Sequence, residues 1–81
     1  QIPRINFAFL DGGHEYDDII FEFSHINPYQ LPGDIIVFDD YNKVQFPGLV
    51  SAVNEVCETY NYHIEVIAAT KNREYVIATK S

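Results

Sequence analysis

Two nearly continuous apolar runs, residues 5–10 and 35–38, constrain the fold of this chain more than any other feature. Runs that are apolar at odd and even positions alike are typical of strands covered on both faces of a parallel sheet. Each run is followed by acidic residues: Asp11 follows the first, and Asp39 and Asp40 follow the second. Because the carboxyl ends of parallel strands meet at one edge of a sheet, the pattern predicts that three carboxylates converge there.

Two helices and two further strands are predicted from the remaining pattern. Apolar residues at helical spacing predict an amphipathic helix over residues 16–26, and Pro47 suits the first turn of a second helix. The last predicted strands are residues 64–69 and 75–79. The polar loop 70–73 between them is short enough for an antiparallel hairpin.

The predicted order is therefore strand, helix, strand, helix, strand, strand, an α/β fold. Two consecutive βαβ units predict three parallel strands followed by a C-terminal antiparallel hairpin, and right-handed crossovers place both helices on one face of the sheet. Yet both faces of the first two strands are apolar. Because a large exposed apolar patch is a liability, we expect another segment or a second copy of the chain to cover the helix-free face.

Size and charge limit the possible functions. At 81 residues the chain is predicted to be a single domain, and its net charge of −7 comes without a basic stripe. This composition argues against a nucleic-acid binder and against attraction to anionic membranes. No apolar run approaches the roughly 18 residues of a membrane span. The single cysteine, Cys57, suits a reducing compartment, so a cytoplasmic location is predicted.

The three carboxylates, Asp11, Asp39 and Asp40, are candidate metal ligands. Adjacent parallel strands lie about 4.8 Å apart, so side chains at their ends can share one hard cation such as Mg²⁺ through oxygen atoms. The alternative is structural, because short acidic side chains often cap helices or close Asx turns. The residue pattern by itself leaves both interpretations open.

His14 is the candidate general base, because it comes three residues after Asp11 at the turn that precedes the first helix. A neutral imidazole at this edge could remove a proton from a substrate hydroxyl. The alternative is a histidine that packs on Tyr16 or faces solvent. His25 and His63 lack a comparable setting and are expected to be structural or solvent-facing.

Other side chains have simpler predicted roles. Asp17 and Asp18 suit the first helical turn, where acids interact favourably with the helix dipole. Cys57 lies among apolar helix positions and is expected to be a core thiol. Tyr41 and Phe46 flank the loop after the second acidic turn and could line an acceptor pocket or cover the core. The sequence contains no Gly-rich phosphate loop, CxxC, HExxH or GxSxG motif, which argues against nucleotide triphosphatases, zinc enzymes and serine hydrolases.

The segments FAFLDGGHEY, LPGD, IIVFDDY and FPGLVSAVNE carry a resemblance to a known family. In this combination the chain resembles the C-terminal half of a class I S-adenosylmethionine-dependent methyltransferase, and in particular the small-molecule O-methyltransferases that include the macrocin-type sugar methyltransferases. The resemblance runs from about Ile5 to Glu58. Where the family has a second glycine after Pro32-Gly33, this chain has Asp34, a change expected to have little effect.

The resemblance implies roles for particular residues. Asp11, Asp39 and Asp40 would bind a divalent cation such as Mg²⁺ that orients the acceptor hydroxyl. Asp11 and Gly12 would approach the methionine end of S-adenosylmethionine. His14 takes the position of the lysine base in catechol-type relatives, so it would be the catalytic base.

The fold implied by the resemblance is a seven-stranded, Rossmann-like sheet. The family's Gly-rich cofactor turn and its ribose-binding acid have no counterpart in residues 1–81. We therefore expect this chain to be the C-terminal acceptor and metal part of a longer methyltransferase, inactive alone, with either the N-terminal half or a homodimer partner over the bare sheet face.

The resemblance predicts methylation of a small-molecule hydroxyl but does not identify the acceptor. Two other interpretations stay open. One is a non-enzymatic α/β module that self-associates through its uncovered sheet face. The other is a metal-dependent hydrolase of phosphoesters, which would act without a methyl donor.

Overall fold

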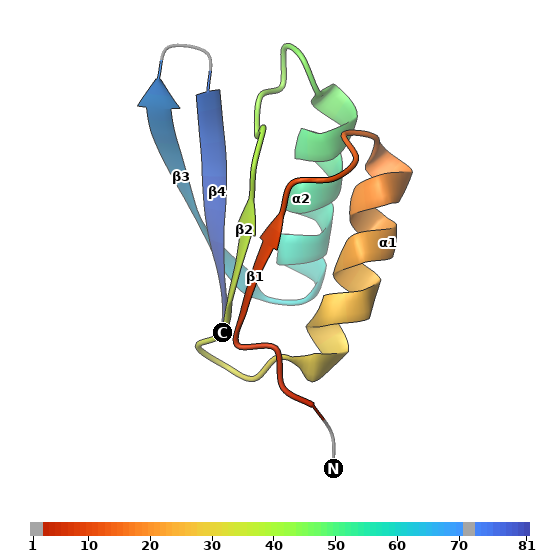
Figure 1. Cartoon of the computed structure of the whole chain (residues 1–81), viewed down its shortest axis with the longest axis vertical. Helices are drawn as coiled ribbons and strands as arrows, with labels where there is room; N and C mark the ends of the chain where they lie inside the picture. The colour runs from red at the N-terminus through yellow and green to blue at the C-terminus, as the bar shows by residue number, and fades with distance from the viewer. Residues whose placement is uncertain (1–2, 71–72) are drawn as a thin grey trace.

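The computed structural model describes residues 3–70 and 73–81 (Figure 1). The elements follow in the order β1 (Phe7–Leu10), α1 (Tyr16–Ile26), the 3-10 helix η1 (Asn27–Tyr29), β2 (Ile35–Phe38), α2 (Pro47–Thr59), β3 (Tyr62–Thr70) and β4 (Arg73–Lys80). The predicted element order is confirmed. The hairpin strands are longer than predicted, since Thr70 and Arg73, both expected in the loop 70–73, belong to β3 and β4. The central residues of that loop, 71–72, like residues 1–2, lie outside the described part of the chain.

The four strands form one mixed sheet in the order β1-β2-β4-β3. β1 and β2 are parallel, with Phe7 opposite Ile35, whereas β4 is antiparallel to both of its neighbours. The prediction of three parallel strands was therefore wrong, since only β1 and β2 form a parallel pair. The crossover through α2 skips one position in the sheet, and β4 fills that position when the hairpin turns back.

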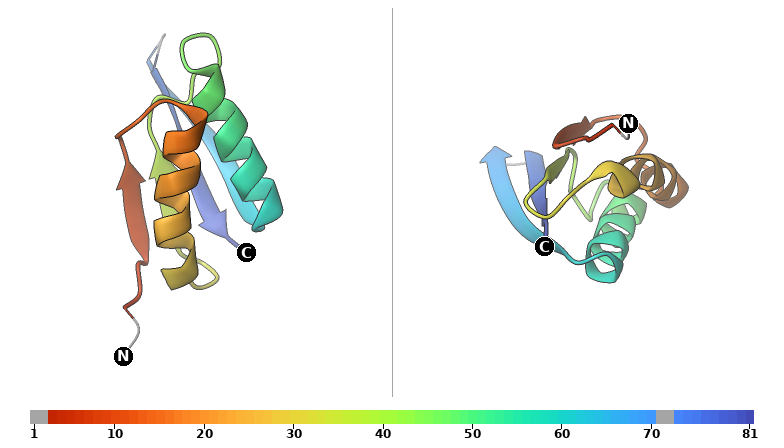
Figure 2. Two further views of the ribbon diagram at one scale, coloured as in Figure 1. Left: turned by 90° about the vertical axis from the view of Figure 1, so that its right-hand side faces the viewer. Right: turned by 90° about the horizontal axis from the view of Figure 1, so that it is seen from below.

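Both helices cover the same face of the sheet, as predicted (Figure 2). The core lies between the helices and this face and consists of Ile19, Phe23, Ile36, Phe38, Leu49, Ala52, Val53, Val56, Cys57, Tyr62, Val76 and Ala78. Gly48 lets the helices approach closely, because a Cβ there would lie 3.1 Å from the backbone nitrogen of Tyr16. The N-terminal ends of α1 and α2 thereby meet beside the carboxyl ends of β1 and β2.

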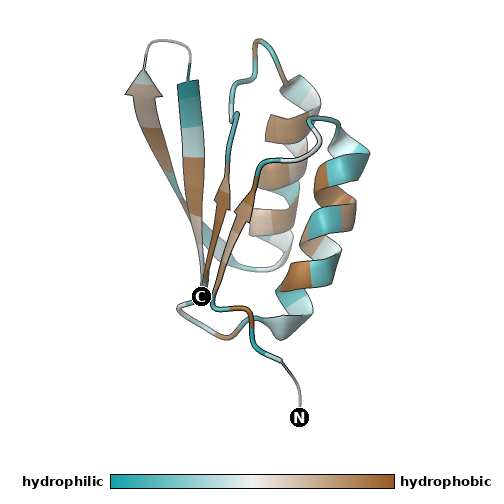
Figure 3. Cartoon of the chain, in the orientation of Figure 1, coloured by the Kyte–Doolittle hydropathy of each residue, from teal (hydrophilic) through white to brown (hydrophobic). Residues whose placement is uncertain are grey.

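The opposite sheet face carries no helix, although β1 and β2 are hydrophobic along most of their length (Figure 3). Phe7 and Phe9 of β1 are 59% and 54% exposed, and Ile35, Val37 and Ile77 continue the surface as partly buried side chains. The expected apolar residues on a helix-free face are therefore present. Their exposure is greatest on β1, which lies at the edge of the described sheet.

The turn before β2 depends on Asp34, which we expected to matter little. Its side chain is 3% exposed and accepts hydrogen bonds from Arg4 at 2.6 and 3.1 Å and from the Leu31 backbone N–H at 2.7 Å. The hydrogen bonds from Arg4, followed by the one from Leu31, hold the pKa of Asp34 below its ordinary value. Gly33 supplies the left-handed backbone that the turn requires, with φ of 97°. Asp34 therefore ties the N-terminal segment to the sheet.

Candidate functional site

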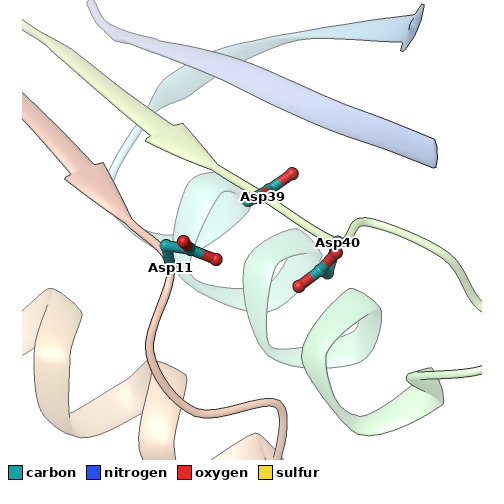
Figure 4. Close-up of side chains that lie close together, drawn as sticks. All are labelled: Asp11, Asp39 and Asp40. Atoms are coloured by element: carbon teal, nitrogen blue, oxygen red, sulfur yellow. The ribbon is translucent and has the colours of Figure 1, made fainter.

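The structure brings Asp11, Asp39 and Asp40 together at the carboxyl ends of β1 and β2 (Figure 4). One oxygen atom from each carboxylate lies within 4.8 Å of those from the other two. The strand ends are joined by a hydrogen bond of 3.1 Å from the Asp39 N–H to the Leu10 carbonyl, which extends the parallel ladder into the turn. The strand-end argument therefore placed these side chains correctly, whereas their role as metal ligands stays a prediction.

The three carboxylates differ in environment. Asp39 is 6% exposed, and its Oδ2 accepts a hydrogen bond of 3.3 Å from Arg73 on β4. Asp11 is exposed, whereas Asp40 is partly buried and contacts His14. Figure 4 shows the side chains of Asp11 and Asp40 turned toward each other. The cluster therefore has a buried member paired with Arg73, a partly buried member paired with His14 and one exposed member, Asp11.

Asp40 has an unusual backbone conformation, with φ of 58°. Residues other than glycine seldom occupy this left-handed region, although aspartate tolerates it better than most. The conformation turns the chain sharply from β2 into the following loop, where the Asn42 N–H donates to the Asp40 carbonyl at 2.8 Å. Asn61, in the turn before β3, has a similar φ of 61°, so the positive φ of Asp40 serves to turn the chain and does not by itself mark a functional site.

His14 reaches the same site from the turn before α1. Its Nε2 lies 2.8 Å from Oδ2 of Asp40, and its ring stacks on Phe46 with ring centroids 4.1 Å apart and planes 15° apart. The alternative was packing on Tyr16, but the aromatic ring stacked on His14 is that of Phe46, and the Tyr16 hydroxyl donates to Glu55 at 2.7 Å. Phe46, expected to be a pocket wall or a lid over the core, does pack against the core, and it also contacts the candidate base.

The loop after β2 is held by hydrogen bonds that sequence patterns did not reveal. Oδ1 of Asn42 accepts from the Val44 N–H at 2.9 Å and from the Gln45 N–H at 3.2 Å. The Phe46 N–H donates to the Asn42 carbonyl at 2.7 Å. An asparagine followed by a short polar loop is the signal that could have predicted this Asx turn. The turn sets the position of Phe46 just before α2.

The glycines after Asp11 leave room for acidic side chains of α1. A Cβ at Gly12 would lie 2.7 Å from Oε2 of Glu22, and a Cβ at Gly13 would collide with the side chain of Asp18. Oδ2 of Asp18 accepts a hydrogen bond of 3.3 Å from the Glu15 N–H at the start of the helix. Asp18 therefore caps the helix, consistent with its predicted structural role.

Two clefts border the carboxylate cluster. One, of about 370 Å³, lies beside the turn after β1 and is lined by Phe9, Leu10, Asp11, Gly12, Phe21, Glu22, His25 and Ile26. The other, of about 330 Å³, lies on the helix-free face and is lined by Phe9, Val37, Asp39, Ala69, Thr70, Arg73 and Tyr75. Asp11 and Gly12, the predicted cofactor residues, line the first cleft. Asp39 lines the second.

The remaining candidate residues lie away from this site. His25 and His63 are exposed on α1 and β3, in agreement with the prediction that they are structural or solvent-facing. Cys57 is 1% exposed in the core, and its burial raises the pKa of the thiol to about 12. Such a thiol forms very little of the reactive thiolate near neutral pH, so Cys57 is a core residue as predicted.

The spacing of the carboxylate oxygens is compatible with a hard cation. Oxygen ligands about 2.1 Å from an octahedral Mg²⁺ lie about 3.0 to 4.2 Å from one another, and ligands about 2.4 Å from Ca²⁺ lie up to about 4.8 Å apart. No separation in the cluster exceeds 4.8 Å, so all of them lie within the limit for Ca²⁺. Mg²⁺ would need any separation above about 4.2 Å to contract.

Comparisons with known proteins relate this geometry to a fold. Over its whole length the chain is similar to a crystal structure of a "putative O-methyltransferase" from Klebsiella pneumoniae, with a TM-score of 0.62 and 16% sequence identity, and it spans 42% of that chain. It is also 33% identical over 75 residues to Uncharacterized protein R132 of Acanthamoeba polyphaga mimivirus, a match that includes 84% of this chain and 34% of the viral protein. No protein-family model matches the sequence.

The structural comparison supports a similarity of fold, and both comparisons show how much of each protein is matched. The chain has an α/β fold similar to that of the Klebsiella pneumoniae structure, and it spans well under half the length of either protein. In the described residues, neither helix is both long and apolar enough to cross a membrane.

Proposed function

We propose that this chain is the acceptor- and metal-binding part of an S-adenosylmethionine-dependent O-methyltransferase that acts on a small-molecule hydroxyl. The observation that carries the proposal is the site at the ends of β1 and β2, where three carboxylates lie within 4.8 Å of one another and His14 bonds to one of them. The similarity of the fold to an O-methyltransferase structure supports the same interpretation.

Asp11, Asp39 and Asp40 would hold the divalent cation, and Asp11 and Gly12 would lie against the cofactor. When bound, the cation would lower the pKa of the acceptor hydroxyl, and S-adenosylmethionine would supply the methyl group. His14 would accept the hydroxyl proton, since an imidazole is a suitable base near neutral pH. The exposed Asp11 and the adjoining cleft leave the side of the turn accessible to ligands.

The exposed surfaces of the sheet support the proposal that more protein belongs beside β1. This edge strand consists of Phe, Ala, Phe and Leu and carries none of the charges, prolines or bulges that usually protect an edge. The opposite edge, β3, carries His63 and Glu65 and has an irregularity between Ala68 and Thr70. We therefore infer that β1 is paired and its apolar face covered in the complete enzyme, and that the 81-residue chain is inactive alone.

Metal binding is the first test of this proposal. Titration of the chain with Mn²⁺ by calorimetry should show saturable binding with a Kd on the order of 0.1–1 mM, the range of weak all-oxygen Ca²⁺ sites. Asp39→Asn and Asp40→Asn should each weaken binding at least tenfold. Asp17→Asn is the matched control, because it removes one exposed acid from α1 outside the cluster. Equal weakening by Asp17→Asn and Asp39→Asn would indicate a general charge effect and would refute the metal site.

Cofactor binding is the second test. The proposal expects no measurable affinity of this chain for S-adenosylmethionine, because the Gly-rich turn is absent from residues 1–81. Micromolar binding would contradict the proposed division of the site between two halves. If the coding sequence continues upstream of Gln1, it should encode a Gly-rich turn directly after a strand.

A non-enzymatic module is the second candidate, favoured by one observation. The exposed Phe7 and Phe9 offer an apolar surface through which two copies could associate. For this module, sedimentation should show a dimer that Phe9→Ser dissociates, and Asp39→Asn should leave the biological function unchanged. If the chain belongs to an enzyme, Asp39→Asn should instead abolish the function of the full protein. The cytoplasmic location stays a prediction for both candidates.

A further inference from the structure

The orientation of His14 is determined by two contacts from the segment that follows β2. Asp40 binds the ring at Nε2, with a distance of 2.8 Å to Oδ2. Phe46 lies against the face of the ring, with 4.1 Å between centroids and an interplanar angle of 15°. An in-plane hydrogen bond and a stacked face together restrict both rotation and tilt of the imidazole.

The contact with Asp40 also determines which ring nitrogen carries the proton. An ionised carboxylate can only accept hydrogen bonds, so Nε2 of His14 must donate to it. In a neutral imidazole one nitrogen is a donor and the other an acceptor, so Nδ1 then has the free lone pair. The described part of the chain provides no hydrogen-bond partner for Nδ1.

We infer that Asp40 and Phe46 are positioning residues for His14, and that Nδ1 is the atom that accepts the proton of the acceptor hydroxyl. The inference rests on the proposed function, because it specifies the base of that reaction. The hydroxyl proton passes to the lone pair of Nδ1 and the O–H electron pair stays on oxygen, while the Nε2 proton remains hydrogen-bonded to Asp40. His14 thereby becomes an imidazolium that the Asp40 carboxylate stabilises.

His25 provides an internal reference in the same chain. Its Nδ1 lies 2.8 Å from the backbone carbonyl oxygen of Phe21, which also can only accept. His25 is therefore expected to carry its proton on Nδ1, the opposite of His14. One long-range ¹H–¹⁵N spectrum of the labelled chain at mildly alkaline pH reports both tautomers. His14 should show a protonated Nε2 and an unprotonated Nδ1, and His25 the reverse.

Variants separate the two contacts. Asp40→Gly tolerates the positive φ and removes the carboxylate, so the His14 tautomer should relax to the mixture of a free imidazole. Asp40→Asn should also fail to fix the tautomer, because an amide can donate to a ring nitrogen as well as accept from it. Phe46→Leu should shift the His14 ring protons downfield by removing the stacked ring, and Phe46→Tyr should retain their upfield position. Nuclear Overhauser contacts between the two rings in the unmodified chain test the stack without any substitution.

A protonated Nδ1 on His14, or ring-proton shifts that Phe46→Leu leaves unchanged in a folded chain, would overturn the inference. The outcome is independent of the metal test. If Mn²⁺ fails to bind but the tautomer and the stack are observed, the proposed function fails while the positioning of His14 is established. If Mn²⁺ binds and the tautomer is reversed, only the role of Nδ1 is refuted.

Discussion

Truncation of Phe38 and of Phe9 to alanine should have very different effects on the stability of this chain. Both residues belong to the paired strands β1 and β2, but Phe38 faces the helices and is 0% exposed, whereas Phe9 faces away from them and is 54% exposed. The comparison therefore tests whether one sheet face is bare in solution, the feature on which the proposal of a missing partner depends.

The magnitudes follow from burial. Removal of a fully buried phenylalanine costs about 3–5 kcal/mol, because transfer and cavity terms add. Full burial of such a side chain is worth about 1.5–3 kcal/mol, so Phe9, slightly less than half buried, should contribute about 0.7–1.4 kcal/mol. A chain of 81 residues is expected to have an unfolding free energy of about 4–12 kcal/mol. Phe38→Ala should therefore bring the chain close to unfolding, and Phe9→Ala should not.

Urea denaturation followed by circular dichroism measures both effects. With an m-value of about 1–1.5 kcal/mol/M, Phe38→Ala should lower the midpoint by about 2–5 M and Phe9→Ala by about 0.5–1.4 M. A loss of 3 kcal/mol or more for Phe9→Ala, at a concentration where sedimentation shows a monomer, would refute the bare face. A loss that grows with protein concentration would instead show that a second copy covers Phe9, because association stabilises the folded state by mass action.

Three further predictions concern single side chains. Because Arg4 lowers the pKa of Asp34, this ion pair should stabilise the fold above the ordinary carboxyl pKa of about 3.9. The stabilisation should be lost as the pH falls through the lower pKa of the folded state. Thermal melts from neutral to strongly acid pH should show this loss, and Asp34→Asn should make the melting temperature less dependent on pH. Cys57, with its pKa raised to about 12, should react with a thiol reagent only as fast as the chain unfolds, and at once in urea; rapid reaction of the native chain would contradict its burial. Gly13→Ala should lower the unfolding free energy in urea melts by about 1–3 kcal/mol through its collision with Asp18, and because Cβ of Asp18 takes part in that collision, adding Asp18→Ala should not relieve the loss.

The elements were predictable because their signals are local. The predicted helix over residues 16–26 and the predicted strand over residues 35–38 coincide with α1 and β2, since helical spacing, β-branched residues and the flanking Asn27-Pro28 all act within a few residues. The strand order was not predictable from such signals. The position next to β2 could be taken by β3 or by β4, and which strand takes it depends on packing between distant segments.

In the candidate site, too, some features were predictable from the sequence, whereas contacts between distant residues were not. The rule that parallel strands end at one edge predicts that Asp11, Asp39 and Asp40 meet. Their present partners are distant in sequence: His14 and Asp40 are 26 residues apart, and Asp39 and Arg73 are 34 apart. No short motif marks such pairs. Asp34 illustrates the point, since its effect depends on Arg4, which lies 30 residues away.

Asp39 and Asp40 are adjacent in sequence but belong to two different surroundings. Asp39 continues the alternation of β2, lines the cleft on the uncovered face and pairs there with Arg73, whose side chain is 64% exposed. Asp40, turned by its positive φ, bonds to His14, whose ring rests on Phe46. The two contacts that orient His14 thus come from this chain, whereas Asp39 lies in a cleft on the helix-free sheet face that we propose is covered by further protein. Covering the bare face should therefore change the accessibility of Asp39 and Arg73 and leave the orientation of His14 as it is.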